Sequence, residues 1–318
     1  MFDLVTVGHF VMDLIISPRI AYPKVTLGGP AAFVSLAANK LGAKVSVVSK
    51  VGVDFQECLA WLRQNNVDLS QVQIVENAFT TGFVLIYDDK KRKLQLKNRA
   101  PQIFPKNIPD SLRAIVIHAA PVANELSIEV IRKLRSKTQL LSVDPQGFLR
   151  EFDEIGNARL KRLNDMSFLQ YCDVFKSTIQ EIKTMTGLTK LGTAMKRVRK
   201  CGVKTVLVTM GEKGVLAYFG QEFYHIPACK PKTLKDQTGA GDVFIGAFLA
   251  EYIRDREPLW CCCVGSAAAS FVVEDVGSKR FGEKSEVYER ATKIYEKGIK
   301  PLPNDTIYLE GTVVGKNR

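Results

Sequence analysis

Short apolar runs rich in β-branched residues alternate along this chain with segments whose apolar positions recur every three or four residues. The apolar runs predict strands at 4–10, 44–52, 72–76, 115–120, 140–146, 173–178 and 205–211. The periodic segments predict helices at 31–42, 55–66, 125–137, 179–187 and 191–202. Alternating strands and helices are typical of a three-layer αβα sandwich with a mostly parallel central sheet. We expect residues 1–318 to form one such α/β domain.

One stretch breaks this alternation. Residues 80–101 predict two strands joined by a charged turn, which is a β-hairpin without a crossover helix. Residues 14–26 are extended too, so 14–27 and 79–101 together predict a small β-sheet that projects from the main one. This sheet is either a decoration or a lid that keeps water from a reacting site. We favour the lid, because segments rich in candidate ligand groups flank both of its pieces.

Two further segments bear on how the chain meets partners. The unpaired backbone groups of an exposed strand edge can pair with a strand of another chain, so we expect a homodimer through the lid. The tail is strand-like at 306–311 and 312–315, and an edge strand and a subunit contact are both open for it.

Composition and charge narrow the choice of partners. The chain has 318 residues, of which 46% are hydrophobic and 25% charged, as in ordinary globular proteins. Its formal charge of +12 suits anionic partners such as nucleotides, phosphates, nucleic acid or lipid headgroups. There is no evident basic stripe with interleaved aromatic residues, which disfavours nucleic acid. The apolar amino terminus carries Asp3, His9 and Asp13, so we expect no membrane span there.

The cysteines indicate the compartment. There are seven Cys without a C-x-x-C pair and only three His, which argues against a zinc site. An odd number of cysteines without a framework favours a reducing environment, so we expect a cytoplasmic protein. The run 261–263 is expected to pack as small hydrophobes on a buried helix.

The segment "DQTGAGDVFIGAF", residues 236–248, suggests chemistry. Gly239, Ala240 and Gly241 precede Asp242 and an apolar run that predicts a buried helix. Successive backbone N–H groups at a helix start can hold negative charge developing on phosphoryl oxygens. A neighbouring carboxylate is then placed to take a proton from an attacking alcohol. The alternative, ranked about equal on these four residues, is a simple cap in which Asp242 offsets the helix dipole.

Other nucleotide motifs are missing from the sequence. Nothing fits G-x-x-x-x-G-K-[ST], so a Walker loop is excluded. No G-x-G-x-x-G follows the first strand either, which disfavours an NAD-dependent enzyme.

The same segment resembles the D-T-x-G-A-G-D signature of the PfkB or ribokinase family of carbohydrate kinases. Further stretches resemble elements of that family in the family's order: 27–55, 206–218 and 267–278. The resemblance runs from about residue 4 to about residue 280. It implies a ribokinase-like fold with a β lid and a phosphotransferase that moves the γ-phosphate of ATP to an alcohol.

The resemblance also implies roles for single residues. Asp242 would be the catalytic base, with Gly239, Ala240 and Gly241 as the anion hole. Asp13, on the loop after the first strand, would hold substrate hydroxyls, and Gly28 and Gly29 would let the substrate lie against backbone. The alternatives are purely structural roles: Asp13 would only end a strand, and the two glycines would only form a turn. The positions implied for nucleotide binding are Thr209, Gly211, Gly214 and Thr238.

Two positions depart from the family pattern. The family commonly has Asn-x-x-Glu supporting Mg²⁺ through water, and here Glu181 is present but Thr178 stands in the Asn position. We therefore expect ATP and Mg²⁺, with Glu181 as a weak, water-mediated metal contact; whether a monovalent cation assists is open. Ribokinase-type sugar kinases usually carry Gly-Gly-x-x-x-Asn, and here the last position is Phe33, which argues against a ribokinase-like grip on ribose.

Two more stretches bear on the acceptor. "LKNRAPQI" and "VDPQGFLR" resemble the archaeal myo-inositol kinase branch of the family, and they place Arg99 and Gln146 near the substrate. The alternatives are purely structural: Arg99 would be a surface residue of the hairpin, and Gln146 would cap the turn after Asp144. The leading hypothesis is an ATP- and Mg²⁺-dependent kinase of a small polyol, with myo-inositol favoured. The alternatives are a nucleoside or sugar kinase, since Phe33, Phe83 and Phe148 leave room for base stacking, and a nucleotide-binding regulator without turnover.

Overall fold

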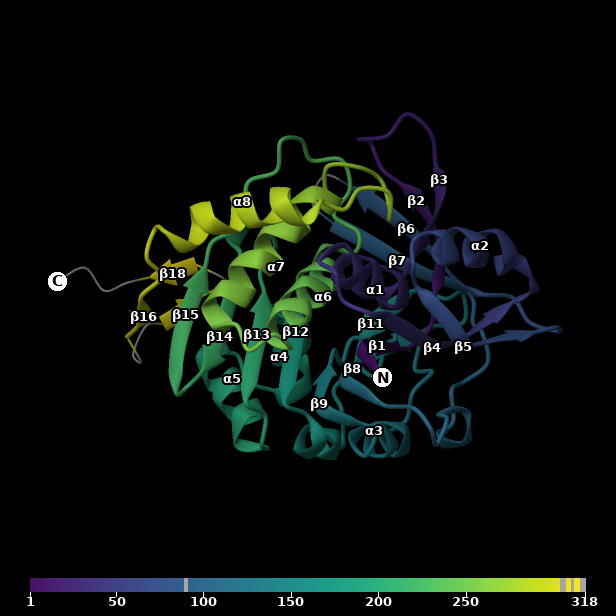
Figure 1. Cartoon of the computed structure of the whole chain (residues 1–318), viewed down its shortest axis with the longest axis horizontal. Coiled ribbons are helices and arrows are strands. Elements are labelled where there is room, and N and C mark those ends of the chain that lie inside the picture. The colour runs from purple at the N-terminus through teal and green to yellow at the C-terminus, as the bar shows by residue number, and fades with distance from the viewer. Residues whose placement is uncertain (89–90, 304–306, 310–311, 315–318) are drawn as a thin grey trace.

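The computed structural model describes residues 1–88, 91–303, 307–309 and 312–314. Its centre is a ten-stranded sheet in the order β16-β15-β14-β13-β12-β9-β8-β1-β4-β5 (Figure 1). The strands are β1 (Phe2–Val7), β4 (Val45–Gly52), β5 (Asp68–Val75), β8 (Ala114–Ala119), β9 (Thr138–Val143), β12 (Val174–Thr178), β13 (Thr205–Thr209), β14 (Val215–Phe219), β15 (Glu222–Ile226) and β16 (Pro301–Leu302). Pairing is parallel from β5 to β13 and antiparallel from β13 to β16, which confirms the mostly parallel sheet.

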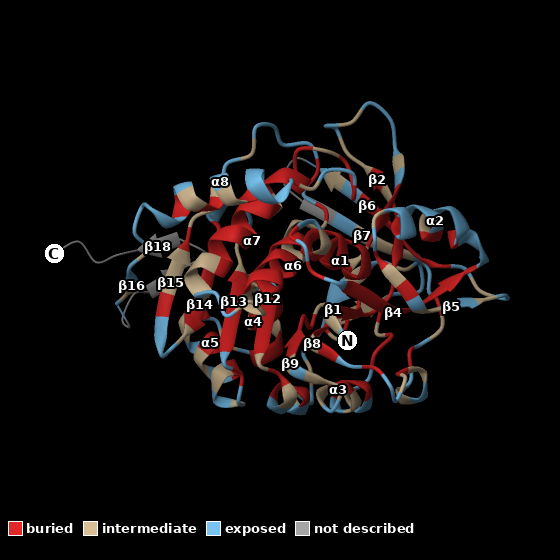
Figure 2. Cartoon of the chain, viewed as in Figure 1, coloured by how far each residue is buried: buried red, intermediate tan, exposed pale blue. Residues whose placement is uncertain are grey.

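Helices cover both faces of this sheet. One face carries α1 (Pro30–Lys40), α2 (Gln56–Gln64), α6 (Ala240–Tyr252), α7 (Pro258–Val272) and α8 (Lys284–Tyr295). The other carries α3 (Ile128–Arg135), α4 (Ile179–Thr186) and α5 (Leu191–Lys200). Short 3₁₀ helices lie at Val53–Phe55, Pro105–Asn107, Ser167–Tyr171 and Gly211–Lys213. A separate apolar core fills the space on each side, so the predicted three-layer sandwich is confirmed (Figure 2).

The two central helices of the first face are apolar nearly all round. Both α6 and α7 are buried along most of their length, because they lie between the sheet and the outer helices. The run Cys261–Cys263 is fully buried on α7, as the sequence predicts. None of the described helices has the length and apolar character needed to cross a membrane.

The predicted second sheet is present. Its strands are β2 (Val11–Ile16), β3 (Lys24–Gly28), β6 (Thr81–Asp88) and β7 (Lys91–Asn98), in the order β3-β2-β6-β7. Two antiparallel hairpins are joined by parallel pairing of β2 with β6. The sequence suggested that Asp13 lies on a loop, and this prediction is wrong. Asp13 lies in the middle of β2, opposite Thr26 and Phe83. The alternation of buried and half-buried residues already begins at Val11.

The remaining strands are short. β10 (Arg150–Phe152) and β11 (Ala158–Leu160) form a small hairpin, and β17 (Ile307–Leu309) pairs with β18 (Thr312–Val314). The strand-like prediction for the tail is thus right at these positions, while 306, 310–311 and 315 lie outside the described residues. Just before them, β16 adds an edge strand to the main sheet beside β15.

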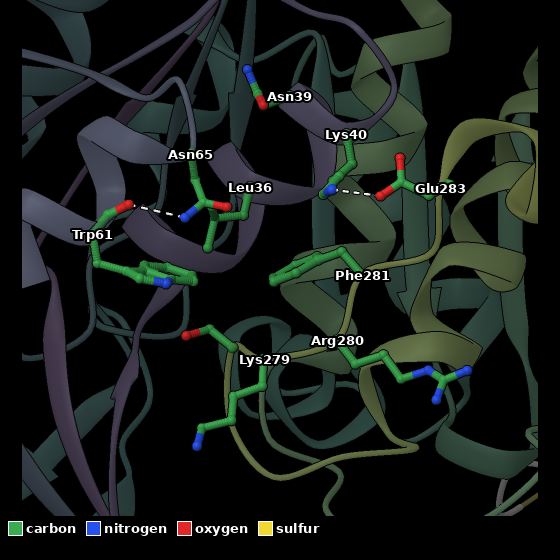
Figure 3. Close-up of a pocket in the computed structure, with 10 residues that line it drawn as sticks. Leu36, Asn39, Lys40, Trp61, Asn65, Lys279, Arg280, Phe281 and Glu283 are labelled. Atoms are coloured by element: carbon green, nitrogen blue, oxygen red, sulfur yellow. Dashed lines mark hydrogen bonds and ion pairs between the residues drawn. The ribbon is translucent and has the colours of Figure 1, made fainter.

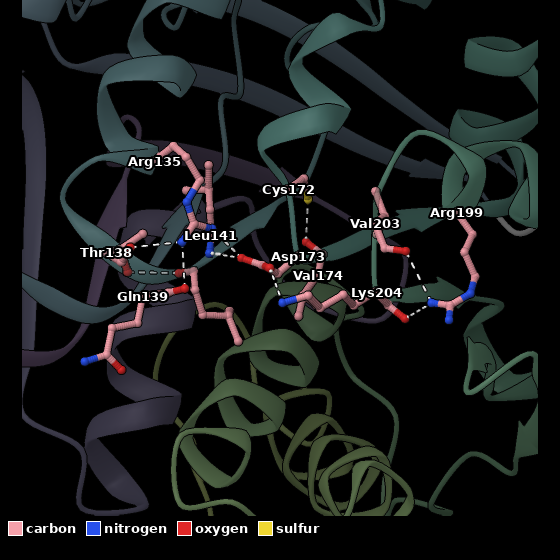
Figure 4. A network of polar contacts seen from close by, with 11 residues as sticks. Arg135, Thr138, Gln139, Leu141, Cys172, Asp173, Val174, Arg199, Val203 and Lys204 are labelled. Carbon is pink, nitrogen blue, oxygen red and sulfur yellow. Dashed lines mark hydrogen bonds and ion pairs between the residues drawn. The ribbon is translucent and has the colours of Figure 1, made fainter.

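The start of β12 is anchored by a polar network (Figure 4). The carboxylate of Asp173 accepts the Leu141 N–H at 3.0 Å and forms ion pairs with Arg135 and, at 3.0 Å, Lys204. Arg135 also donates to two carbonyl oxygens at the start of β9. These contacts hold β12 in register with β9, and so they determine which side chains meet at the carboxyl ends of the two strands.

Candidate active site

The turn before α6 provides free backbone donors. Gly239 caps the helix with φ 77°, and a Cβ at this position would lie 2.5 Å from the Phe33 ring. The N–H of Ala240 donates to the Gln237 carbonyl at 3.3 Å. Within the part of the chain that the structure describes, the N–H groups of Gly239 and Gly241 have no protein acceptor. Two backbone donors are therefore available in the turn that precedes Asp242.

Asp242 is the acid of this turn, and it sits in an unusual electrostatic environment. Its side chain is 14% exposed, and its Oδ1 lies 4.0 Å from the Nζ of Lys176. Burial raises the pKa of Asp242 to about 6; the Lys176 cation opposes this rise, whereas the charge of Asp144 adds to it. The loss of solvation destabilises the charged form of Asp242 more than the nearby Lys176 cation stabilises it. The carboxylate is therefore a better proton acceptor than an ordinary surface Asp.

A buried ion pair lies beneath Asp242. Lys176, near the end of β12, places its Nζ 2.6 Å from Oδ2 of Asp144, which follows β9. Burial lowers the pKa of Lys176, but the charges of Asp144 and Asp242 outweigh this effect and raise the pKa above its usual range. Lys176 is thus a permanent cation shared by two carboxylates.

Gln146 belongs to the same network, and Arg99 does not. The N–H of Gln146 donates to Asp144 at 3.0 Å, and its Oε1 accepts from Arg150 at 2.7 Å. The guanidinium of Arg150 lies over the Phe83 ring, 5.7 Å from its centroid, and its charge lowers the pKa of Asp242. Arg99 directly follows β7, is exposed and lies over Phe152 instead, at 5.4 Å.

The second sheet carries Asp13, which pairs with Thr26 of β3 and Phe83 of β6. Asp13 is buried on β2, and a Cβ at Gly28 would lie 2.0 Å from its Oδ2. Glycine at 28 therefore lets the carboxylate lie against the backbone of β3. Gly29 follows with φ 81° and leads into α1, whose first residue is Pro30.

Three of the four positions implied for nucleotide binding, and the position implied for metal, lie at neighbouring strand ends; the fourth, Thr238, directly precedes Gly239. Thr209 ends β13 directly beside Thr178 of β12, and Gly211 and Gly214 bound the 3₁₀ turn that follows. Thr178 caps α4 in a reciprocal box: its N–H donates to Glu181 Oε2 at 2.7 Å, and its hydroxyl accepts the Glu181 N–H.

The metal expectation can be compared with this geometry. Among the described residues no three His, Cys, Asp or Glu side chains cluster to hold a metal directly. One oxygen of Glu181 is committed to the helix cap, and this carboxylate is close enough to raise the pKa of Asp242. The residues present therefore fit a hydrated Mg²⁺ held through water, and they do not fit a site of direct protein ligands.

Three functional candidates escaped the sequence reasoning: Lys176, Asp144 and Arg150. The available signal was Lys176 itself, a charged residue inside the otherwise apolar strand run "DVFKST". A lysine that is buried in a strand needs a carboxylate partner. The sequence did not say which carboxylate, because the partner comes from a different strand.

A cavity lies away from this site, between α1, α2 and residues 278–283 (Figure 3). Its volume is about 270 Å³, and Trp61 and Phe281 point into it from opposite sides. It shares no residue with the Asp242 cluster. Its wall is nonetheless linked to that cluster, because the Phe281 ring lies 6.5 Å from the Phe33 ring, which covers Gly239.

Gly239→Ala is expected to destabilise the protein far more than the same change at Gly220. Both glycines have positive φ, 77° and 54°, but only at 239 would the new methyl meet the Phe33 ring, at 2.5 Å. Positive φ alone costs alanine about 1 kcal/mol, and overpacking adds about 1–3 kcal/mol. Urea unfolding of the two variants measures the difference. Equal losses of stability in both variants would show that Phe33 does not press on this turn.

Comparison with known proteins identifies the family. Residues 1–284 match the pfkB family carbohydrate kinase. The chain is 31% identical over 287 residues to a cytidine kinase of Thermococcus kodakarensis, which covers 87% of this chain and 98% of that protein. It is 28% identical over 286 residues to an inositol 3-kinase of Arabidopsis thaliana, covering 86% and 75% respectively.

Solved structures agree on the fold. A pyrophosphate-dependent kinase of the ribokinase family, in complex with a pyrophosphate analog and myo-inositol, has a TM-score of 0.78 at 24% identity. The superposition covers 90% of this chain and 99% of that one. This likeness confirms the ribokinase-like fold. Together with the family match over most of its length, it shows that the chain belongs to the pfkB family of carbohydrate kinases, enzymes that transfer phosphate to hydroxyl groups.

Proposed function

We propose that the protein transfers the γ-phosphate of ATP to a hydroxyl of a small polyol, with myo-inositol as the acceptor. The observation that carries this proposal is the Asp242 turn. A carboxylate with a pKa of about 6 lies in the same helical turn as the N–H groups of Gly239 and Gly241, for which the described residues provide no acceptor. A base and an anion site in one turn are what phosphoryl transfer to an alcohol requires.

The roles follow from the geometry. Asp242 takes the proton of the acceptor hydroxyl as the new O–P bond forms and the bond to the leaving phosphate breaks. The N–H groups of Gly239 and Gly241, at the positive end of α6, hold the charge on the phosphoryl oxygens. ATP supplies the phosphoryl group when bound, and Mg²⁺ held through water near Glu181 balances the phosphate charge. Residues 1–318 would work as one kinase domain, with Thr209, Gly211, Gly214 and Thr238 on the nucleotide side.

The polar side chains that we propose for acceptor binding, Asp13 and Gln146, suit an acceptor with many hydroxyls. Asp13 accepts hydrogen bonds, and the amide nitrogen of Gln146 donates them while its oxygen is held by Arg150. Stacking of a nucleobase has less support. Phe33 and Phe83 are only 1% and 3% exposed, and their faces contact Gly239, Phe152 and Arg150 instead.

A nucleoside acceptor is the second candidate, favoured by the identity to the cytidine kinase. An acceptor panel decides between the two: myo-inositol, cytidine, adenosine, ribose and fructose, each with ATP or pyrophosphate, with and without K⁺. We expect the highest kcat/KM for myo-inositol with ATP. A higher kcat/KM for cytidine or adenosine would transfer the assignment to a nucleoside kinase. ATP binding without release of ADP for any acceptor would indicate a regulator.

We also propose that two copies pair through the outer face of the lid. Val25 of the edge strand β3 is 61% exposed beside Leu14, and Ile86 of β6 is 38% exposed beside Ile16. The double variant Val25→Lys/Ile86→Lys is expected to change a dimer into a monomer in light scattering, because lysine is costly to bury against a second copy. A wild-type mass of one chain would contradict this pairing.

A further inference from the structure

We infer that Tyr87 is a positioning residue for the transfer reaction: its hydroxyl latches the lid onto the turn that carries the anion site. This inference rests on the proposed function and adds a group to it. Tyr87 is on β6, and it shares the inner face of that strand with Phe83. Its hydroxyl lies 2.7 Å from Oγ1 of Thr238, the residue directly before Gly239.

The direction of the hydrogen bonds follows from their partners. The Thr238 hydroxyl lies 2.6 Å from Oδ1 of Asp236, and an ionised carboxylate only accepts. The single proton of Thr238 is therefore used on Asp236, so the Tyr87 hydroxyl must be the donor to Thr238. The result is a one-way chain from the lid through Thr238 to a buried carboxylate, and each bond in such a chain strengthens the next.

The same carboxylate holds a second contact between the lid and the body of the protein. Asp236 also accepts the Thr238 N–H at 2.9 Å and, through Oδ2, the Gly277 N–H at 3.1 Å. Gly277 lies under Thr26 of lid strand β3, and a Cβ there would be 1.9 Å from the Thr26 Oγ1. Two lid strands thus touch the two backbone segments that Asp236 ties together.

This arrangement couples closure of the lid to the shape of the anion site. When Tyr87 is in place, Thr238 and Asp236 hold the backbone that enters Gly239, so the free N–H groups are oriented while the lid excludes water. When the lid opens, the turn loses one of its supports. A kinase gains from this coupling, because oriented donors in an open site would also promote transfer of the phosphoryl group to water.

The test is Tyr87→Phe, which keeps the ring and removes the hydroxyl. The control is Tyr224→Phe on β15, whose hydroxyl donates to Glu222 at the edge of the main sheet. The first measurement needs no activity: amide hydrogen exchange of the protein alone. Losing one hydrogen bond of ordinary strength is expected to speed exchange at 81–88, 91–98 and 236–242 by about 5-fold in Tyr87→Phe, and not in the control.

The second measurement is the ratio of phosphate lost to water to phosphate transferred to the acceptor, with kcat and the acceptor KM taken separately. We expect this ratio to rise about 5-fold and kcat to fall by a similar factor in Tyr87→Phe. Unchanged exchange at 81–88 and 91–98 overturns the latch, and unchanged partition between water and acceptor overturns its role in the reaction. A wild type that phosphorylates no acceptor would defeat the proposed function, while the exchange result would still decide on the latch.

Discussion

Asp242→Asn is expected to lower kcat by about 10²- to 10⁴-fold, because the amide cannot take the proton of the acceptor hydroxyl. The change keeps the size of the side chain, so substrate affinity and circular dichroism should stay near those of the wild type. Steady-state kinetics with saturating donor measures the loss. Asp110→Asn is the matched control, since Asp110 is 90% exposed and precedes β8, at the strand ends opposite those that carry Asp144 and Lys176.

The same variant should be more stable than the wild type at neutral pH. The folded pKa of Asp242, about 6, lies above its ordinary value of 3.8, so the folded state binds more protons than the unfolded state between these values. Stability therefore falls as pH rises from about 4 to about 6, by up to about 3 kcal/mol. Asn does not titrate, so Asp242→Asn should gain up to this amount at pH 7 and nothing below pH 4.

Two outcomes would contradict the role of Asp242. Transfer at an undiminished rate in Asp242→Asn would exclude it as the base. Thermal unfolding with the same pH dependence in the variant and the wild type would show that the carboxylate is not desolvated in the folded protein. A stable and inactive variant is the combination expected of a residue whose burial serves the reaction at the expense of stability.

Lys176→Met is expected to have the second large effect, on both stability and pH dependence. Asp144 is fully buried, and removal of its partner leaves a charge without compensation, at a cost of about 3–5 kcal/mol. Lys176 also lowers the pKa of Asp242, so its loss raises that pKa above about 6. The acid limb of the kcat/KM profile should move to higher pH, with about a tenfold loss per pKa unit on the acid side.

A second variant separates the two effects. Asp144→Asn/Lys176→Met removes both charges, so stability should recover towards that of the wild type. The acid limb should stay above that of the wild type, because Lys176 acts on Asp242 more strongly than Asp144 does. Lys200→Met, at the exposed end of α5, is the control for loss of a cation. An acid limb at the same pH in all variants would mean that Lys176 does not tune the base.

The layers of the fold were predictable because each element carries its own period. The helix at 31–42 and the strands at 44–52 and 173–178 match α1, β4 and β12 within a few residues. The start of α6 was predictable for a local reason too, since Gly239 reaches a φ of 77° that other residues rarely adopt. By contrast, the strand that contains Asp13 was predicted to begin at residue 14 and begins at Val11, because a short run that is buried on one face only gives a weak signal for where a strand starts.

What the sequence determined by itself was local: the alternation that makes a layered α/β sandwich, and a glycine turn with an acid at the start of a buried helix. What only the tertiary structure decided was which distant side chains meet there. Lys176 and Asp144 are 32 positions apart and Tyr87 and Thr238 are 151 apart, and each pair forms through the register of strands in the two sheets. Periodicity reports which face of an element is buried, whereas the pKa of Asp242 and the contact between Tyr87 and Thr238 depend on charges and hydroxyls that other elements bring to that face.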